Sequence, residues 1–362
     1  MIRLLHAADL HLDSPFSSLD PQQAAHRREE QRDVLRRLVR ECDGLGCDVL
    51  LLAGDLFDSD FFYRESAELL RSELGRLKAR VFIAPGNHDP WSPSSIYARL
   101  QWPENVYIFH TRNIETVRIS ALNLNVCGAA FLEARQSGLM QGFTAPADGT
   151  MSVMVLHGDL GNPASPYNPI SEAEIAASGL RYLALGHVHR GEQRVIGGTT
   201  VGVPGCAMGR GFDETGVKGA LLVELSETDC RLTQIPLGGR IYQSLSLPAG
   251  DDPLAAIETR LPPDSSRDIY RITLTGSCPK PDLRALQRQL APRFHSLELV
   301  DATLPPAELW QAAGEDSLKG VFLQLLQELY TKSPEEAERR LAAEAAELGL
   351  AVMEGREVPE LW

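Results

Sequence analysis

The chain has 362 residues, of which 43% are hydrophobic and 23% are charged, a composition typical of a globular protein. Since none of its apolar runs approaches the ~20 residues that span a bilayer, we expect no membrane association and a cytoplasmic location. The formal net charge of −14 argues against bulk electrostatic binding to nucleic acid, although bound cations or a basic partner subunit would offset it. The six cysteines form no CxxC pair, which is typical of reduced, structural thiols.

The first two thirds of the chain alternate between apolar runs and amphipathic stretches. Apolar residues recur at helical spacing in 22–40 and 66–77, which predicts two helices that each follow a strand. This β-α-β order is typical of parallel strands with helical crossovers. Strands are expected at 2–8, 48–53, 80–84, 105–109, 115–119, 122–127, 152–156, 181–185, 193–203 and 218–225. We therefore predict an α/β (α+β) fold in which two sheets form a sandwich flanked by helices.

The pattern changes near Arg240. A small α/β domain is predicted there, with strand, helix, strand, helix and strand at 241–247, 254–261, 268–275, 282–290 and 297–300. Two helices are expected after Pro305-Pro306, at 317–330 and 334–348. The sequence thus predicts three parts: a main domain at 1–240, a small domain at 241–304 and a C-terminal helical segment at 305–362.

Five short motifs that carry histidine or aspartate each follow a predicted strand. They are Asp9-Leu10-His11, Gly54-Asp55, Gly86-Asn87-His88-Asp89, His157-Gly158-Asp159 and Gly186-His187-Val188-His189. Ligands of open α/β sheets bind beyond the carboxyl ends of the strands, so these motifs should converge. A single histidine or aspartate at a strand end is usually structural, but an ordered set of five indicates a site.

These side chains have the chemistry of a two-metal centre. Imidazole and carboxylate ligands suit manganese, iron and zinc, and two ions ~3.5–4 Å apart form a clamp for phosphoryl displacement. Asp55, at the end of the second strand, is the natural bridge between the ions. The predicted metal ligands are Asp9, His11, Asp55, Asn87, His157, His187 and His189.

The order of the five motifs resembles the calcineurin-like metallophosphoesterases, over roughly residues 1–240. Within that family, the chain is similar to the SbcD-type DNA repair nucleases and most of all to their YhaO-like branch. The opening Asp9-Leu10-His11-Leu12-Asp13-Ser14-Pro15-Phe16 and the segment from Pro204-Gly205 to Lys218-Gly219 carry this narrower resemblance. The region 241–304 resembles the family's capping domain only in the order of its elements.

The resemblance implies two divalent ions and a DNA phosphodiesterase, an exonuclease or endonuclease. We expect manganese, with iron, zinc or magnesium as alternatives, and a metal-bound hydroxide as the nucleophile. One ion would bind Asp9, His11, Asp55 and His189; the other would bind Asp55, Asn87, His157 and His187. His88 matches the histidine that stabilises the transition state or protonates the leaving oxygen. The implied partners are DNA and an SMC-like coiled-coil ATPase, and a homodimer is left open.

Some residues depart from the nuclease pattern or allow two interpretations. Asp58 stands where relatives carry a histidine that positions DNA, which puts the exonuclease geometry in doubt. Arg190 and Arg210 are predicted phosphate contacts, with surface salt bridges as the alternative. Asp89 and Asp159 are predicted to orient ligand imidazoles, with helix capping as the alternative.

Other functions remain open at this stage. The apolar stripe from Leu318 to Leu329 is a predicted docking surface for the ATPase, with intramolecular packing as the alternative. The rival enzymatic hypothesis is a phosphatase or small-molecule phosphodiesterase at the same ions. A non-catalytic clamp is a third hypothesis, which the retention of all seven ligands and His88 disfavours.

Overall fold

The computed structural model describes residues 1–59 and 61–356. Within this part of the chain, a six-stranded sheet has the order β14-β13-β1-β2-β3-β4. Strands β1 to β4 are parallel, whereas β13 and β14 run antiparallel to their neighbours. The strands span Ile2–Ala7 (β1), Val49–Leu52 (β2), Arg80–Ile83 (β3), Val106–Ile108 (β4), Gly219–Leu225 (β13) and Cys230–Pro236 (β14).

A second six-stranded sheet in the described residues has the order β11-β12-β10-β7-β6-β5. Its strands span Glu115–Ile119 (β5), Leu124–Gly128 (β6), Met151–His157 (β7), Tyr182–Gly186 (β10), Glu192–Ile196 (β11) and Thr199–Val203 (β12). The prediction of one strand at 193–203 is wrong. The chain reverses at Gly197 and Gly198, both with positive φ, so β11 and β12 pair as an antiparallel hairpin.

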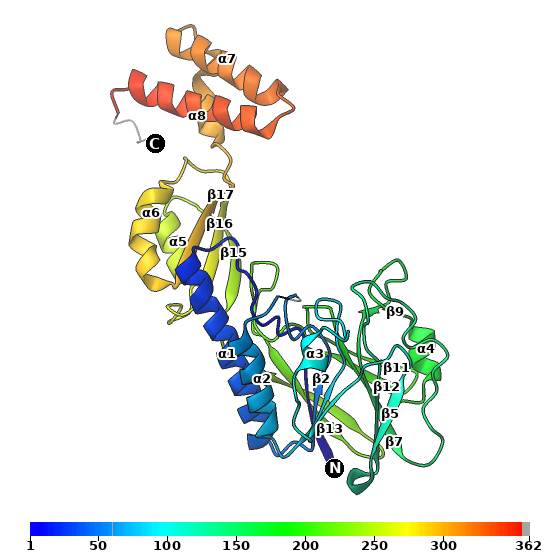
Figure 1. Cartoon of the computed structure of the whole chain (residues 1–362). Helices are drawn as coiled ribbons and strands as arrows, with labels where there is room; N and C mark the ends of the chain where they lie inside the picture. Colours follow the sequence, from blue (N-terminus) through cyan, green and yellow to red (C-terminus); the bar gives the residue numbers. More distant parts are fainter. Residues whose placement is uncertain (60, 357–362) are drawn as a thin grey trace. The chain divides into compact units, whose positions relative to one another are not determined.

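The two sheets pack face to face. Successive residues of each strand point to opposite sides, so one set of side chains faces the other sheet and the alternate set faces the helices. Leu4 and Leu51 belong to the buried cluster shared with Val153 and Tyr182 of the second sheet. Their neighbours Leu5 and Leu50, by contrast, pack with residues of two helices on the outer side. These helices are α1 (Pro21–Gly44) and α2 (Arg64–Gly75), which lie side by side (Figure 1). The predicted sandwich flanked by helices is therefore confirmed.

The remaining elements of this region are short. Helix α4 (Glu172–Ala177) covers the outer face of the second sheet, where Ile175 packs with Leu183 and Leu185. It begins with a capping box in which Ser171 and Glu174 satisfy each other's backbone amides. The others are α3 (Ile96–Arg99), η1 (Ser120–Leu122), β8 (Asp159–Leu160) and β9 (Pro169–Ile170).

Contacts between residues divide the chain into one unit that ends at Ile241 and another that begins at Tyr242. In the second unit, three parallel strands have the order β15-β16-β17. Apolar side chains of α7 and α8 pack together around Leu323 and Ala346. The predicted boundary at 304 stays a prediction. The elements are β15 (Tyr242–Pro248), α5 (Pro253–Arg260), β16 (Ile269–Thr275), α6 (Leu283–Leu290), η2 (Ala291–Arg293), β17 (Ser296–Asp301), η3 (Ala307–Gly314), α7 (Leu318–Lys332) and α8 (Glu336–Met353).

No helix in the described residues combines the length and the apolar character needed to cross a bilayer.

Candidate metal centre

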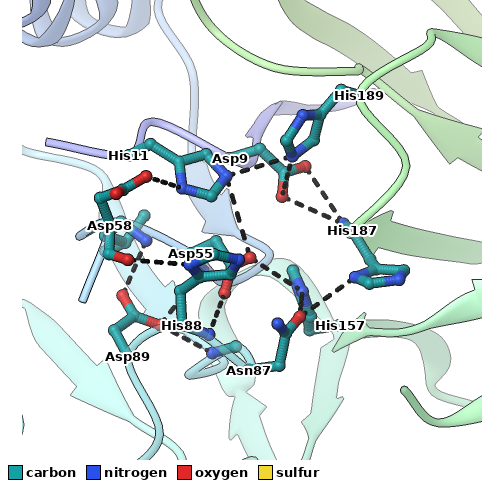
Figure 2. Close-up of polar contacts among 12 residues, drawn as sticks. Asp9, His11, Asp55, Asp58, Asn87, His88, Asp89, His157, His187 and His189 are labelled. Carbon is teal, nitrogen blue, oxygen red and sulfur yellow. Dashed lines mark hydrogen bonds and ion pairs between the residues drawn. The ribbon is translucent and has the colours of Figure 1, made fainter. Parts of the chain in front are cut away.

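The five predicted motifs meet at the carboxyl ends of β1, β2 and β3 of the first sheet and of β7 and β10 of the second. The first two motifs run together because Asp9 N donates to Gly54 O (3.1 Å) and His11 N donates to Asp55 O (3.0 Å). The last motif joins them through His187 N, which lies 3.1 Å from Asp9 Oδ2. Figure 2 shows the resulting group of side chains, which includes Asp9, His11, Asp55, Asn87, His88, His157, His187 and His189.

One half of the group is formed by Asp9, His11 and His189, whose ligand atoms all lie within 4.8 Å of one another. The two Nε2 atoms of His11 and His189 are 3.1 Å apart. Their Nδ1 atoms face carboxylates, at 3.0 Å from Asp58 Oδ1 for His11 and 2.6 Å from Glu214 Oε1 for His189. Because a neutral imidazole carries its proton toward the carboxylate, both Nε2 lone pairs point at the same spot, which suits a cation.

The other half has the same character. His157 Nδ1 faces Ala53 O at 2.9 Å, so a neutral ring would carry its proton on the carbonyl side and turn the lone pair of Nε2 toward the site. This Nε2 is 2.8 Å from Asn87 Oδ1, which is also an acceptor, and 3.3 Å from Asp55 Oδ2. His187 Nδ1 lies 3.1 Å from the same Asn87 oxygen. Several acceptors thus converge around one point, which a divalent cation would satisfy.

Asp55 lies between the two halves. Its Oδ2 is 3.3 Å from His157 Nε2 and 3.9 Å from His11 Nε2. Asp9 also contributes to both groups of potential ligands, since its carboxylate lies within 4.8 Å of Asp55 and His157 ligand atoms. The residues present therefore fit a pair of ions that share a carboxylate.

Burying this cluster of charged side chains is energetically unfavourable unless opposite charges lie beside them. Burial raises the pKa of Asp9 to about 7, helped by repulsion from Asp55 and opposed by His157. Burial acts the same way on Asp55, but its attraction to His157 and His11 outweighs it and holds the pKa of Asp55 below its usual range. Burial also lowers the pKa of His11 and of His187 to about 4, which favours their neutral, metal-binding form. At His157, attraction to Asp55 outweighs burial and raises the pKa to about 9, so a bound cation would replace a proton there.

The backbone of the site is strained. Asp9, His11, Asp55 and His187 all adopt positive φ, between 45° and 97°. Non-glycine residues rarely occupy this region, and such strain concentrates at functional sites. Close approach also explains Gly86, since a Cβ there would lie 2.1 Å from Asp55 Oδ1.

His88 lies at the open side of the site. It is exposed, its backbone N donates to Asp55 Oδ1 (2.9 Å), and its Nδ1 lies 2.8 Å from Asp58 O. Its ring is 4.9 Å from that of His11. With Nδ1 held by the carbonyl, the other ring nitrogen is the one that a substrate can reach.

The two aspartates predicted to orient imidazoles act differently. Asp89 is buried and accepts hydrogen bonds from the backbone N of Asp55, Leu56 and Gly86 and from the Tyr97 hydroxyl. It therefore positions Asp55 through the backbone instead of through an imidazole. The Asp159 carboxylate accepts a bond from Asn162 Nδ2 (3.0 Å), while the imidazole of His157 bonds to a backbone carbonyl.

The two predicted phosphate contacts differ in their surroundings. Arg190 is exposed in the turn after His189. Arg210 is half-buried, and its guanidinium bonds to Asp58 Oδ1 (2.7 Å) and Glu214 Oε1 (2.8 Å), so carboxylates already engage its charge. Three residues at the site were absent from the predicted set: Asp58, Glu214 and Tyr167, whose ring lies 4.9 Å from the His187 ring.

The fold and the cluster of histidines and aspartates define a metallophosphoesterase. The family model of calcineurin-like phosphoesterases matches residues 2–191, and the chain belongs to this family. Members use a dinuclear metal site and hydrolyse phosphate esters.

Two curated relatives are similar over part of the chain. An uncharacterised metallophosphoesterase, YhaO of Bacillus subtilis, is 30% identical over 244 residues, covering 63% of this chain and 58% of the relative. The DNA double-strand break repair protein Mre11 of Methanopyrus kandleri is 25% identical over 205 residues, covering 52% of this chain and 44% of the relative. The chain thus spans about half the length of these relatives. A solved dimetal phosphatase from Danio rerio is 12% identical, with a TM-score of 0.44, covering 66% of this chain and 96% of the other.

Proposed function

We propose that the chain hydrolyses phosphodiester bonds of DNA at a dinuclear centre, as a repair nuclease that works with an SMC-like coiled-coil ATPase. The observation that carries this proposal is the convergence of imidazoles and carboxylates on two adjacent points, with the exposed His88 beside them. Two ions held there would stabilise the attacking and the leaving oxygen of a phosphoryl transfer. The similarity to a protein named for DNA double-strand break repair supports DNA as the substrate.

The chain's own residues would divide the work between holding ions and handling the substrate. Divalent ions, when bound, lower the pKa of water and withdraw charge from phosphate oxygens. We propose manganese, because the donor set mixes imidazole with carboxylate and amide oxygens. The ions would be held by Asp9, His11, Asp55, Asn87, His157, His187 and His189.

His88 would act on the substrate directly. Asp58 O holds its ring by contact with Nδ1, which leaves Nε2 as the ring nitrogen available to a substrate. In its protonated form, this nitrogen would donate a hydrogen bond to the phosphate as charge develops, or its proton to the leaving oxygen. Its backbone N also binds Asp55, so the ring is placed relative to the bridging carboxylate.

A phosphatase or small-molecule phosphodiesterase is the second candidate function, and the net charge of −14 favours it. The test uses protein loaded with Mn²⁺ and four substrates: labelled single-stranded DNA, labelled double-stranded DNA, a chromogenic phosphodiester and a phosphomonoester. Metal-dependent cutting of DNA that is lost in the His88→Asn variant is the expected result. Release of phosphate from the monoester without cutting of DNA would favour the second function, and DNA binding without turnover would favour a non-catalytic clamp.

The partner is proposed from α7. Leu318, Val321, Leu325 and Leu329 are 80%, 53%, 61% and 60% exposed, and their spacing places them on one side of the helix. The other side packs against α8 through Leu323 and Leu326. Apolar residues three to four apart form the seam by which coiled-coil helices associate, which supports a coiled-coil partner.

A charge introduced into this stripe would test the partner separately from the hydrolytic activity. Leu325→Glu should abolish binding to the purified coiled-coil segment of an SMC-like ATPase while metal-dependent hydrolysis stays unchanged. Gln324→Glu, at an exposed position of the same helix outside the stripe, adds one negative charge and is the matched control. Equal binding by the Leu325→Glu variant and the native chain would contradict this docking surface.

A further inference from the structure

Three charged residues lie behind the imidazoles of His11 and His189, outside the set of predicted ligands. The Asp58 carboxylate contacts His11 Nδ1 at 3.0 Å, and the Glu214 carboxylate contacts His189 Nδ1 at 2.6 Å. Arg210 connects the two carboxylates, with Nη1 at 2.7 Å from Asp58 Oδ1 and Nη2 at 2.8 Å from Glu214 Oε1. We call Asp58, Arg210 and Glu214 the charged bridge.

The charged bridge is built into the protein and is not a surface ion pair. The Glu214 side chain is 3% exposed, and its Oε2 also accepts the backbone N–H of Arg210 (2.8 Å). A carboxylate is rarely buried unless it is paired, so this position requires both its histidine and its arginine. Helix α1 secures the same loops, because Arg27 Nη2 donates to Gly209 O (2.8 Å) and Gln31 Nε2 donates to His11 O (2.6 Å).

The bridge distinguishes the two halves of the centre. A carboxylate at Nδ1 fixes the tautomer of an imidazole, orients its ring and increases the basicity of Nε2. His189 has such a hydrogen-bonded partner in Glu214, and His11 Nδ1 has the Asp58 carboxylate at 3.0 Å as an ion-pair contact, whereas His157 has only the neutral carbonyl of Ala53 at 2.9 Å from its Nδ1. The rings of His11 and His189 are therefore held more firmly at the ion position that they share than the ring of His157 is held at the other position.

We propose that Asp58, Arg210 and Glu214 are positioning residues that orient His11 and His189 and make the ion position between these two rings the tighter of the two. Glu214 acts through His189, and Asp58 acts through His11. Arg210 keeps the two carboxylates at a fixed separation, so that both rings address one point. The inference rests on the proposed dinuclear centre and not on the identity of the substrate.

The test measures metal affinity in the absence of substrate, which separates it from the proposed nuclease activity. Full-length protein is stripped of metal and titrated with Mn²⁺ by calorimetry, in two backgrounds that each keep one ion position. Asn87→Ala keeps the position at His11 and His189, and His189→Ala keeps the position at His157. The expected result is that Glu214→Gln weakens binding about 10- to 100-fold in the first background and less than about twofold in the second.

Two further variants make the outcome specific. Asp58→Asn removes the other carboxylate of the bridge and should weaken the same ion position, which also tests the proposal if Glu214→Gln unfolds. Glu172→Gln makes the same chemical change as Glu214→Gln on the exposed surface of α4 and should leave both affinities unchanged. Thermal unfolding midpoints of metal-free variants check that the fold is retained. Equal weakening in both backgrounds, or an unchanged affinity in the Asn87→Ala background, would overturn the proposal.

Discussion

The buried imidazole of His6 should make the first unit of the chain less stable in mild acid. His6 lies in β1 between the two sheets, where Tyr182 Oη is 2.8 Å from its Nδ1. Its Nε2 has no hydrogen-bond partner in the described residues. Burial lowers the pKa of His6 from its ordinary 6.5 to about 3, so the folded protein keeps the ring neutral.

The size of the effect follows from proton linkage. Above pH 6.5 the ring is neutral in both states, and His6 adds no pH dependence. As the pH falls below 6.5, the unfolded chain binds a proton that the folded chain refuses until about pH 3, so the free energy of unfolding decreases. The slope is ~1.4 kcal/mol per pH unit, and between neutral pH and pH 5 the loss amounts to about 2 kcal/mol.

His6→Gln removes the titration and keeps a polar group for the Tyr182 hydroxyl. Unfolding in urea is followed at pH 7.5 and pH 5.0 on metal-free protein, by hydrogen exchange of peptides from β1 and β2. The native chain should lose about 2 kcal/mol more than the variant between these two pH values. The same loss in both proteins would refute the reasoning, because it would place the acid sensitivity at other groups.

Three substitutions test the metal centre. Asp55→Ala should empty both ion positions, since its carboxylate faces both halves; two ions retained in elemental analysis would contradict this. His88→Asn should keep both ions while phosphodiester hydrolysis falls ~10²–10⁴-fold, and unchanged turnover would exclude its proposed role. Gly86→Ala places a Cβ 2.1 Å from Asp55 Oδ1 and should weaken Mn²⁺ binding, whereas Gly44→Ala, with open space around it, should not.

The strand-end rule accounts for what the sequence could predict of the site. Each predicted ligand lies within four residues of the end of β1, β2, β3, β7 or β10, and the parallel strands bring these ends to one edge. Position along a strand is visible in the hydrophobic pattern, so convergence could be inferred without coordinates. The hairpin β11–β12 was missed although Gly197-Gly198 is a recognisable turn signal between two strand-like runs.

The charged bridge could not be predicted from the sequence, and the cause is physical. Arg210 and Glu214 belong to the irregular segment between β12 and β13, where the sequence has no periodicity that sets the direction of a side chain. The contact of Arg210 with Asp58 joins positions 152 residues apart, and any exposed carboxylate of the chain could have made an equally plausible pair. Which of these pairs forms depends on which side chains are buried. Burial of a loop residue is set by the packing of the whole domain and not by the local sequence pattern.

The burial and pairing of Arg210 make it a poor candidate for binding DNA, although its sequence context predicts a phosphate contact. To bind a phosphate, the Arg210 guanidinium would have to give up its present acceptors. These acceptors are the carboxylates of Asp58 and Glu214, at 2.7 and 2.8 Å. Breaking such pairs would leave the buried Glu214 carboxylate with only the His189 imidazole and the Arg210 backbone N–H as partners, which is unfavourable. Arg190 is exposed beside the last ligand, so the same substitution should weaken DNA binding more at Arg190 (Arg190→Gln) than at Arg210 (Arg210→Gln). The reverse order in a binding titration without metal would show that the charged bridge opens to the substrate.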